Sequence, residues 1–233
     1  MTSVADRPRP RRSALLEVRN WELLTAALLL LVVYVVRHTG AVLGTASDVA
    51  DEVLKAAVMF LAMSSAGVSR RIWIVHVVVA GAAIGLSAVG VVTNSNALTM
   101  TANLLGAYML GFATVLLLRI TLRRRRVTGD TLFGALAIYL SLGIMFGIVY
   151  TAVARSYPEA FDPAQAISEG KTELYYFSFV TLTSLGYGDI SPVYDSVQIL
   201  ATLEAILGVI LLAALVGRVV GLLVAQQTRA ESG

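Results

Sequence analysis

The residues best suited to chemistry form one short run, Thr181-Leu-Thr-Ser-Leu-Gly-Tyr-Gly-Asp189. Gly186 and Gly188 flank a tyrosine in this run, so the backbone can adopt positive φ at two alternate positions without steric cost. Such alternation along an extended strand can aim successive carbonyl groups to one side. Four strands of this kind around an axis would stack rings of oxygen atoms. The distances between these oxygens would suit a cation that has lost its water shell. The run therefore predicts a cation site built from backbone oxygens.

The segment before this run predicts the element that must hold it. Thr172–Ser184, TELYYFSFVTLTS, is apolar and aromatic but only about 13 residues long, too short to span a membrane. It is also too apolar to lie in water, which favours a re-entrant helix that returns as an extended strand. Non-helical backbone at membrane depth is tolerated only where protein buries it or where it lines a watery cavity. The partly negative C-terminal end of this helix would point at the membrane centre.

The composition of the whole chain indicates a membrane protein. Of its 233 residues, 57% are hydrophobic and 14% are charged, and the mean hydropathy is +0.78. Soluble domains carry about 25% charged residues, so this chain lacks the polar surface to remain dissolved. The long apolar runs exclude a disordered chain. The absence of cysteine excludes a disulfide scaffold, thiolate catalysis and Cys-ligated metals.

Six apolar runs approach or exceed the roughly 20 residues that a membrane-spanning helix needs. They are Trp21–Val36, Val49–Gly67, Ile72–Val92, Thr99–Leu118, Thr131–Ala154 and Val193–Val224. The first run is also compatible with a cleaved signal peptide, but Arg37 and His38 directly after it argue against cleavage. The predicted fold class is therefore an all-α membrane protein with six transmembrane helices.

The arginines predict how the chain is oriented in the membrane. Arginine clusters precede the first run, separate the second from the third and the fourth from the fifth, and a single arginine follows the sixth. With six crossings all of these positions fall on one side, which the positive-inside rule makes cytoplasmic. We expect a multi-pass protein of the cell membrane with both termini in the cytoplasm.

The run Ser184–Asp189, SLGYGD, resembles the selectivity filter of the tetrameric potassium-channel family, which usually reads TVGYG. The resemblance covers Thr131–Val224 and implies an outer helix, a turret, a re-entrant pore helix, an extended selectivity filter and an inner helix. It further implies a homotetramer with K⁺ as the permeant ion and no cofactor. The family usually has threonine where Ser184 stands and valine where Leu185 stands, so the stability of the filter is affected more than its K⁺ preference.

The resemblance also assigns roles to individual residues. K⁺ would be bound by the backbone carbonyl oxygens of Ser184, Leu185, Gly186 and Tyr187. The Ser184 hydroxyl would add the innermost ring of oxygen atoms. Gly188 would shape the outer mouth. Asp189 would brace the filter through a hydrogen bond, with Tyr176 as the candidate partner. An aromatic cuff would hold the strand at fixed width, formed by Tyr176, Phe177 and Tyr187.

The inner helix carries the residues that the resemblance implies in gating. Its cavity-lining residues would be Val209, Leu212 and Val216, which share one face at 100° per residue. Gly208 lies at the position of the family's hinge glycine, and helix packing is the alternative role for it. Further candidate bending or packing points are Gly217 and Gly221.

Glu204 is unusual because a carboxylate inside a membrane span is costly and commonly functional. Its direction differs by roughly 110° from the mean direction of the three cavity-lining residues. We therefore expect a buried contact between Glu204 and hydroxyl groups of the pore helix. The alternative is a ring of carboxylates that attracts cations into the cavity.

We expect three parts: a cytoplasmic tail (1–20), a four-helix domain (21–126) and a pore domain (127–233). Four spans before a pore is the layout of voltage-gated relatives, whose fourth helix carries arginine at every third position. Thr99–Leu118 has none, so we expect weak or absent voltage dependence. Because the sequence ends shortly after the sixth run, no fused cytoplasmic ligand-binding module is expected either.

The function favoured by these features is passive, K⁺-selective conduction by a homotetramer surrounded by membrane lipids. The alternatives are a poorly selective monovalent cation channel, a non-conducting regulatory subunit and a potassium-uptake subunit. Uptake subunits usually hold four pore loops in one chain, and here there is one. No Ser/His/Asp set, His/Cys cluster or phosphate-binding loop is visible, so neither an enzyme nor a nucleic-acid partner is expected.

Overall fold

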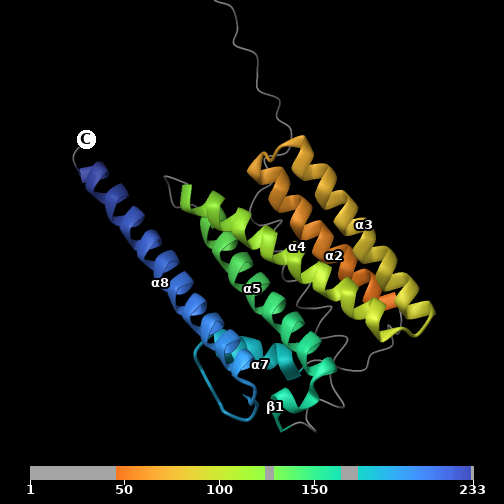
Figure 1. Ribbon diagram of the computed structural model, residues 1–233. Helices are drawn as coiled ribbons and strands as arrows, with labels where there is room; N and C mark the ends of the chain where they lie inside the picture. Colours follow the sequence, from red (N-terminus) through yellow and green to blue (C-terminus); the bar gives the residue numbers. More distant parts are fainter. Residues whose placement is uncertain (1–45, 124–128, 164–172, 232–233) are drawn as a thin grey trace, which may run out of the picture.

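The computed structural model describes residues 46–123, 129–163 and 173–231 (Figure 1). Its helices are α2 (Ala46–Ala66), α3 (Arg70–Val92), α4 (Asn96–Arg123), α5 (Gly129–Ser156), α7 (Glu173–Leu182) and α8 (Asp195–Glu231). The short elements are the 3-10 helix η1 (Pro158–Ala160) and the strands β1 (Phe161–Asp162) and β2 (Ser191–Pro192). The predicted tail 1–20 and the first apolar run, Trp21–Val36, lie outside the described residues.

Four helices in the described part of the chain are long and apolar enough to cross a membrane. They are α3, α4, α5 and α8, which coincide with the third to sixth apolar runs. Helix α8 continues past the last apolar residue because the following AQQTRAE segment consists largely of good helix formers. These helices indicate a membrane-embedded, multi-pass protein.

Helix α2 is as long as a span but carries charged residues that are buried in the bundle. The Lys55 Nζ atom lies 2.9 Å from Asp51 Oδ2 and 2.6 Å from Glu52 Oε1. Lys55 and Glu52 are almost completely inaccessible. Burying an isolated charge costs several kcal/mol, and a close partner of opposite charge offsets part of that cost. The ion pairs therefore explain how a helix with these charges packs inside an apolar bundle.

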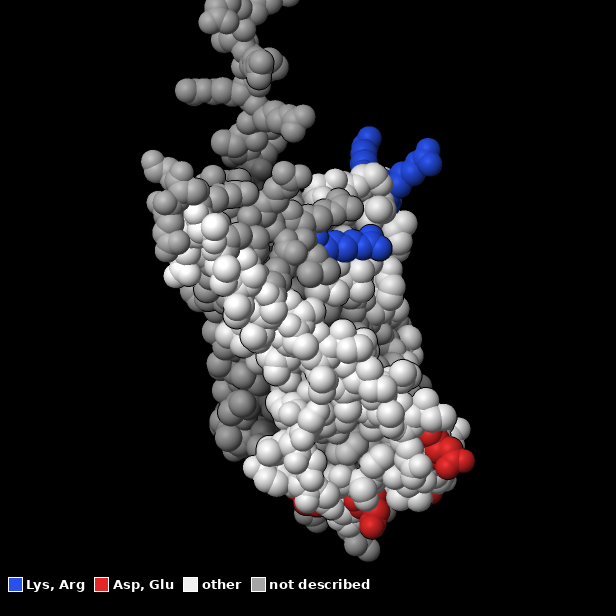
Figure 2. All heavy atoms as spheres, turned by 90° about the vertical axis from the view of Figure 1, so that its left-hand side faces the viewer, with Lys and Arg blue, Asp and Glu red and all other residues white. Residues whose placement is uncertain are grey.

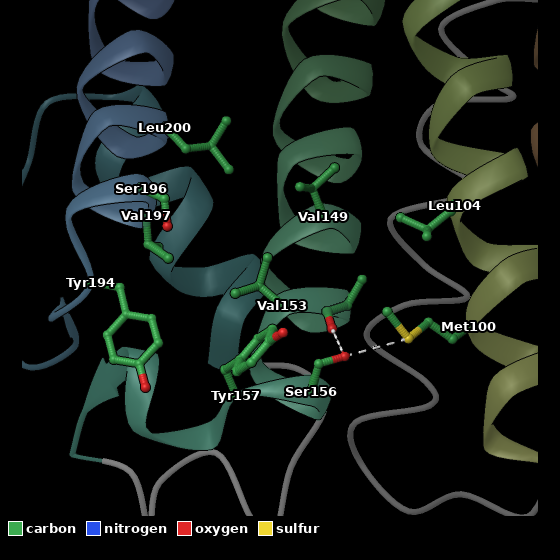
Figure 3. Close-up of a pocket in the computed structure, with 11 residues that line it drawn as sticks. Met100, Leu104, Val149, Val153, Ser156, Tyr157, Tyr194, Ser196, Val197 and Leu200 are labelled. Carbon is green, nitrogen blue, oxygen red and sulfur yellow. Dashed lines mark hydrogen bonds between the residues drawn. The ribbon is translucent and has the colours of Figure 1, made fainter.

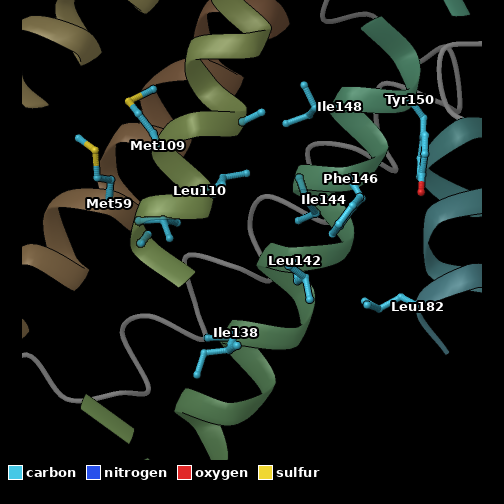
Figure 4. Packing of buried hydrophobic residues seen from close by; sticks show 14 of the residues in the cluster. Met59, Met109, Leu110, Ile138, Leu142, Ile144, Phe146, Ile148, Tyr150 and Leu182 are labelled. Carbon is cyan, nitrogen blue, oxygen red and sulfur yellow. The ribbon is translucent and has the colours of Figure 1, made fainter. Parts of the chain in front are cut away.

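The helices form two groups that meet between α4 and α5. Figure 1 shows α2, α3 and α4 packed side by side, and α5 lies against α4 on the other flank. Buried side chains of α2, α4 and α5 belong to one apolar cluster, in which Figure 4 labels Met59, Met109, Leu110, Ile138 and Ile148. The short helix α7 lies between α5 and α8 (Figure 1). Helix α7 is thus held by two long helices, one on each side.

Charged residues are separated along the long axis of the molecule. On the face that Figure 2 shows, Lys and Arg gather at one end, and Asp and Glu gather at the other. Arg70 and Arg71 at the start of α3, and Arg119 near the end of α4, are exposed. The two ends of the helices therefore differ in charge, as expected for helices whose ends meet different sides of a membrane.

Candidate functional site

The run after α7 is an extended segment with alternating backbone handedness. Ser184, Gly186 and Gly188 have φ angles of +56°, +59° and +76°. Leu185 and Tyr187 lie between them, and all five residues are exposed. Positive φ is uncommon for residues other than glycine and is most strained for β-branched ones. Serine accepts this conformation more readily than threonine would, which suits the residue type found at position 184.

The inner end of the run is held by the last turn of α7. The Val180 carbonyl oxygen accepts hydrogen bonds from the Leu185 N–H at 2.9 Å and the Gly186 N–H at 3.4 Å. The Leu182 carbonyl oxygen accepts a hydrogen bond from the Tyr139 hydroxyl of α5 at 3.0 Å. The last carbonyl groups of a helix lack partners within the helix. Here the run itself and α5 provide partners, so the start of the run is fixed to both helices.

The outer end of the run is held by a tyrosine and by the strand pair. The Tyr176 hydroxyl of α7 donates a hydrogen bond to Asp189 Oδ2 at 2.8 Å. The rings of Tyr176 and Tyr187 stack, with centroids 6.4 Å apart and planes 6° from parallel. Strand β2 follows the run and pairs antiparallel with β1, and the Val193 N–H donates to the Ala160 carbonyl at 2.8 Å. The run is therefore anchored at both ends.

Phe177, the third residue of the predicted aromatic cuff, is buried among rings of α5 and of the segment that follows it. Among the described residues its ring partners are Tyr150, with centroids 5.1 Å apart, and Phe161, at 5.7 Å. Neighbouring residues on a helix point about 100° apart, so Tyr176 and Phe177 cannot face the same surface. Tyr176 and Tyr187 flank the run, whereas Phe177 packs α7 against α5 and the segment that follows it.

Glu204 connects three helices through its two carboxylate oxygens. Oε1 accepts a hydrogen bond from the Ser178 hydroxyl of α7 at 2.5 Å, and Oε2 accepts one from the Tyr150 hydroxyl of α5 at 2.7 Å. The Ser178 hydroxyl also lies 2.8 Å from the Gly143 carbonyl oxygen. Glu204 is fully buried. The structure thus places Glu204 against a hydroxyl of the helix before the run, and full burial leaves no room for a carboxylate ring that faces a cavity.

Three of these contacts involve hydroxyl groups that the sequence analysis did not single out: Tyr139, Tyr150 and Ser178. Their position inside apolar helices is the feature of the sequence that could have indicated these hydroxyl groups. Hydroxyl groups at membrane depth have no water to bond, so they must find partners in the protein. Tyr150 and Glu204 are natural candidates for such a pair because both lie within apolar runs.

The inner helix α8 has an open side and a packed side. Val209, Leu212 and Val216 are each 54% exposed and lie on the open side. Gly208 lies on the packed side, where a Cβ atom would collide with the Leu182 carbonyl oxygen of α7. Gly217, by contrast, has nothing within 4 Å of its Cβ position. Because α8 is a continuous helix, this geometry favours close packing on α7 as the role of Gly208.

Replacing Gly208 with alanine is expected to destabilise the assembled protein. The added methyl group meets a backbone carbonyl that cannot rotate away, and overpacking of this kind costs about 1–3 kcal/mol. Thermal unfolding of the purified protein in detergent, followed by circular dichroism, should show a lower midpoint. Gly217→Ala is the matched control on the same helix and should keep or raise the wild-type midpoint, because its Cβ position is open and alanine is favoured over glycine in a helix by about 1 kcal/mol. Equal midpoints for the two variants would contradict the packing role.

The comparison with known proteins concerns the same part of the chain. No curated protein and no solved structure matches the chain with significance. Residues 138–225 match the protein-family model described as "Ion channel". The matched range includes most of α5, all of α7, the anchored run and most of α8. The match supports an ion-channel domain in this part of the chain.

Proposed function

We propose that the chain forms a homotetrameric, K⁺-selective channel that conducts K⁺ passively across the cell membrane. The observation that carries this proposal is the exposed run with alternating positive φ at Ser184, Gly186 and Gly188. Carbonyl oxygens from Ser184 to Tyr187, contributed by four copies around an axis, would replace the hydration shell of the ion. The Ser184 hydroxyl would add the innermost oxygen ring, and Gly188 would shape the outer mouth.

The surroundings of the run support this use of its backbone. The C-terminal end of α7 directs its carbonyl groups toward the start of the run, and this end carries the negative part of the helix dipole. Asp189 and Tyr176 brace the outer end. One chain supplies one strand, so a closed ring requires several copies. The open side of α8, with Val209, Leu212 and Val216, offers the apolar surface of an inner cavity below that ring.

The same proposal includes the placement of the chain in the membrane. Six spans, with 1–20 as a cytoplasmic tail, 21–126 as a four-helix domain and 127–233 as the pore domain, put the exposed arginines Arg70, Arg71 and Arg119 on the cytoplasmic side. Helix α7 would then enter and leave from the outer side as a re-entrant pore helix. The separation of charge along the molecule supports this orientation (Figure 2).

The test is a reversal-potential measurement on the purified protein in liposomes or planar bilayers under opposed K⁺ and Na⁺ gradients. We expect the reversal potential to follow the K⁺ gradient. A potential that follows Na⁺ equally would replace the proposal with a poorly selective cation channel. Absence of any flux from an assembled oligomer would favour a non-conducting regulatory subunit.

The open probability of this channel is expected to depend only weakly on voltage. Within α4, basic residues occur only near the C-terminal end, at Arg119 and Arg123, and the stretch Thr99–Leu118 has none. One charge moving through the whole field yields about 2.3 kcal/mol per 100 mV, so in the absence of such charges the open probability should change less than about tenfold over 100 mV. Single-channel recording in planar bilayers measures this directly. Steep activation by voltage would contradict the expectation and would point to other moving charges.

A further inference from the structure

A second feature of the structure is an apolar groove where α4, α5 and α8 meet, at the end of the molecule away from Arg70, Arg71 and Arg119. Its volume is about 630 Å³. Figure 3 shows Leu104 of α4, Val149 and Val153 of α5, and Leu200 of α8 around it. Leu104 is 41% exposed, so the groove is open to the surroundings of the bundle. All three helices are apolar enough to span a membrane. The groove therefore opens toward lipid.

The lining of the groove changes from apolar to polar along the helix axes. On α5 it runs from Val149 and Val153 to Ser156 and Tyr157, toward the end of the helix. On α8 it runs from Leu200 back to residues near the start of the helix, where Ser196 and Tyr194 lie. The two polar ends meet, because the rings of Tyr157 and Tyr194 lie 6.3 Å apart. The groove thus has a hydroxyl-lined mouth and an apolar interior.

The dimensions of the groove match one leaflet of a bilayer. Tyrosine rings at the ends of spans sit at the headgroup level, which places the mouth at the membrane surface. From Tyr157 to Val149 the helix rises roughly 12 Å. The hydrocarbon of one leaflet is about 15 Å deep, half of the bilayer core. The apolar part of the groove therefore lies within the hydrocarbon of a single leaflet.

The contents of such a groove follow from its lining. Water in a cavity needs two to four polar partners, and the side chains around the deep part, Leu104, Val149, Val153 and Leu200, offer none. An empty groove would lose the dispersion contacts of every atom that lines it. We propose that this groove is a binding site for a phospholipid of the outer leaflet, with one acyl chain between α4, α5 and α8 and the headgroup at Tyr157 and Tyr194. This site is independent of ion conduction.

The charge at the mouth selects the class of headgroup. The Tyr194 hydroxyl donates a hydrogen bond to Glu159 Oε1 at 2.7 Å. A backbone hydrogen bond within Glu159 and then this tyrosine bond lower the pKa of the Glu159 carboxyl, so it is ionised at neutral pH. A carboxylate at the mouth attracts an ammonium group and repels an extra negative charge. The last turn of α5, beside the lining residue Ser156, also carries Arg155, so this end of the groove has one charge of each sign. This pairing matches the phosphate and ammonium groups of a zwitterionic lipid, such as phosphatidylcholine or phosphatidylethanolamine, better than phosphatidylglycerol.

The direct test uses the unmodified protein in lipid nanodiscs. A small fraction of phosphatidylcholine with a diazirine group on its acyl chain is activated by light, and labelled residues are mapped by peptide mass spectrometry. Leu104 and Val115 are both exposed residues of α4, three helical turns apart, and only Leu104 lines the groove. We expect labelling at Leu104 and Val149–Val153 in clear excess over Val115. Equal labelling of Leu104 and Val115 would overturn the site. Stronger labelling by an anionic phosphatidylglycerol probe would overturn the headgroup assignment.

A matched pair of variants tests the same site by filling it. Val153→Trp places a large ring in the groove, whereas Val115→Trp makes the same change on a lipid-exposed surface of α4. Native mass spectrometry of the purified protein counts the retained phospholipids. We expect Val153→Trp to retain about tenfold less phospholipid than wild type, and Val115→Trp to retain the wild-type amount. Full retention by Val153→Trp would overturn the proposal. If that variant does not fold, the labelling of wild type decides alone.

A second copy of this chain is the rival occupant of the groove. The chain has no native cysteine, so Leu104→Cys introduces a single thiol into it. The thiol is coupled to a benzophenone-maleimide in detergent, the protein is returned to lipid, and light then cross-links the probe to whatever fills the groove. With lipid in the groove, the probe should give phospholipid adducts and no cross-linked pair of chains. Efficient cross-linking between chains, together with lipid labelling at the Val115 level, would assign the groove to a neighbouring copy, which in a ring presents a different surface to it, and would overturn the lipid site.

Discussion

Replacing Gly186 with alanine is expected to abolish most of the K⁺ flux and to leave the helices intact. Gly186 has φ of +59°, and no neighbouring atom lies within 4 Å of its Cβ position. The change therefore acts through the backbone alone. A residue with a Cβ atom in this conformation costs about 1–2 kcal/mol, and a tetramer carries the cost four times. The strand can relieve it by turning the peptide group, which would remove one oxygen from each ring.

The flux assay compares Gly186→Ala with a second glycine-to-alanine change, Gly85→Ala on α3. Gly85 on α3 also has open space around its Cβ position but lies in a regular helix, where alanine is favoured over glycine by about 1 kcal/mol. Gly85→Ala should conduct like wild type. Gly186→Ala should lose at least about tenfold in K⁺ flux, which corresponds to 1.4 kcal/mol. Size-exclusion chromatography of both variants shows whether the oligomer forms.

Wild-type flux in Gly186→Ala, with the oligomer intact, would contradict the filter. It would mean that the alternating backbone of this run is a local feature and that ions pass elsewhere. An intact oligomer without flux is the expected result, because the contacts that hold α7 to α5 and α8 do not involve Gly186. The two readouts therefore separate loss of conduction from loss of assembly.

Features that depend on local backbone chemistry were predictable from the sequence. Gly186 and Gly188 indicated positive φ at alternate positions, and both glycines have it. The third such residue, Ser184, was not predicted, because serine has no preference for this conformation; the N–H groups of Ser184 and Leu185 bond to carbonyl oxygens in the last turn of α7. The helical character of the chain was also predicted, and four of the apolar runs are confirmed as helices long enough to cross a membrane.

Features that depend on contacts between distant segments could be predicted less well from the sequence. The angular position of Glu204 indicated a buried direction, but its partner Tyr150 lies 54 residues away, and no sequence pattern specifies that pairing. The ring contacts of Phe177 with Tyr150 and Phe161 were not predicted, because family resemblance gives residue types but not the helix face. The second apolar run forms most of helix α2, in which Lys55 makes buried ion pairs. The run's hydropathy alone did not indicate that these charges would face the protein.

Replacing Glu204 with alanine is expected to give the largest loss of stability among single substitutions in the pore region. The change leaves the hydroxyls of Ser178 and Tyr150 facing an apolar gap. Losing two buried hydrogen bonds and leaving the Tyr150 hydroxyl without a partner, while the Ser178 hydroxyl keeps the Gly143 carbonyl oxygen, costs about 2–4 kcal/mol in the free energy of unfolding per chain. Because α7 loses its polar connection to α8, K⁺ flux should fall as well.

The exposed pair Glu159–Tyr194 provides a matched control for this contact. Its tyrosine-to-carboxylate distance is 2.7 Å, the same as for Tyr150 and Glu204, but Glu159 is exposed to solvent. In detergent stripped of phospholipid, Glu159→Ala should leave the unfolding transition unchanged, because water replaces the lost partner and no lipid contributes to stability. SDS titration or thermal unfolding in detergent measures both variants under the same conditions. Equal effects of Glu204→Ala and Glu159→Ala would show that burial does not determine the strength of these contacts.

A double-mutant cycle tests whether Glu204 acts through Tyr150. Tyr150→Phe removes the hydroxyl and keeps the ring that packs against Phe161 and Phe177. Residues in direct contact show coupling energies of about 0.5–3 kcal/mol, so the double variant should lose less stability than the sum of the single variants. Glu204→Gln refines the result: an amide offers one acceptor and one donor group to two hydroxyls, so we expect an intermediate loss. Strict additivity of Glu204→Ala and Tyr150→Phe would show that the hydrogen bond between α5 and α8 adds nothing to the stability of the pore.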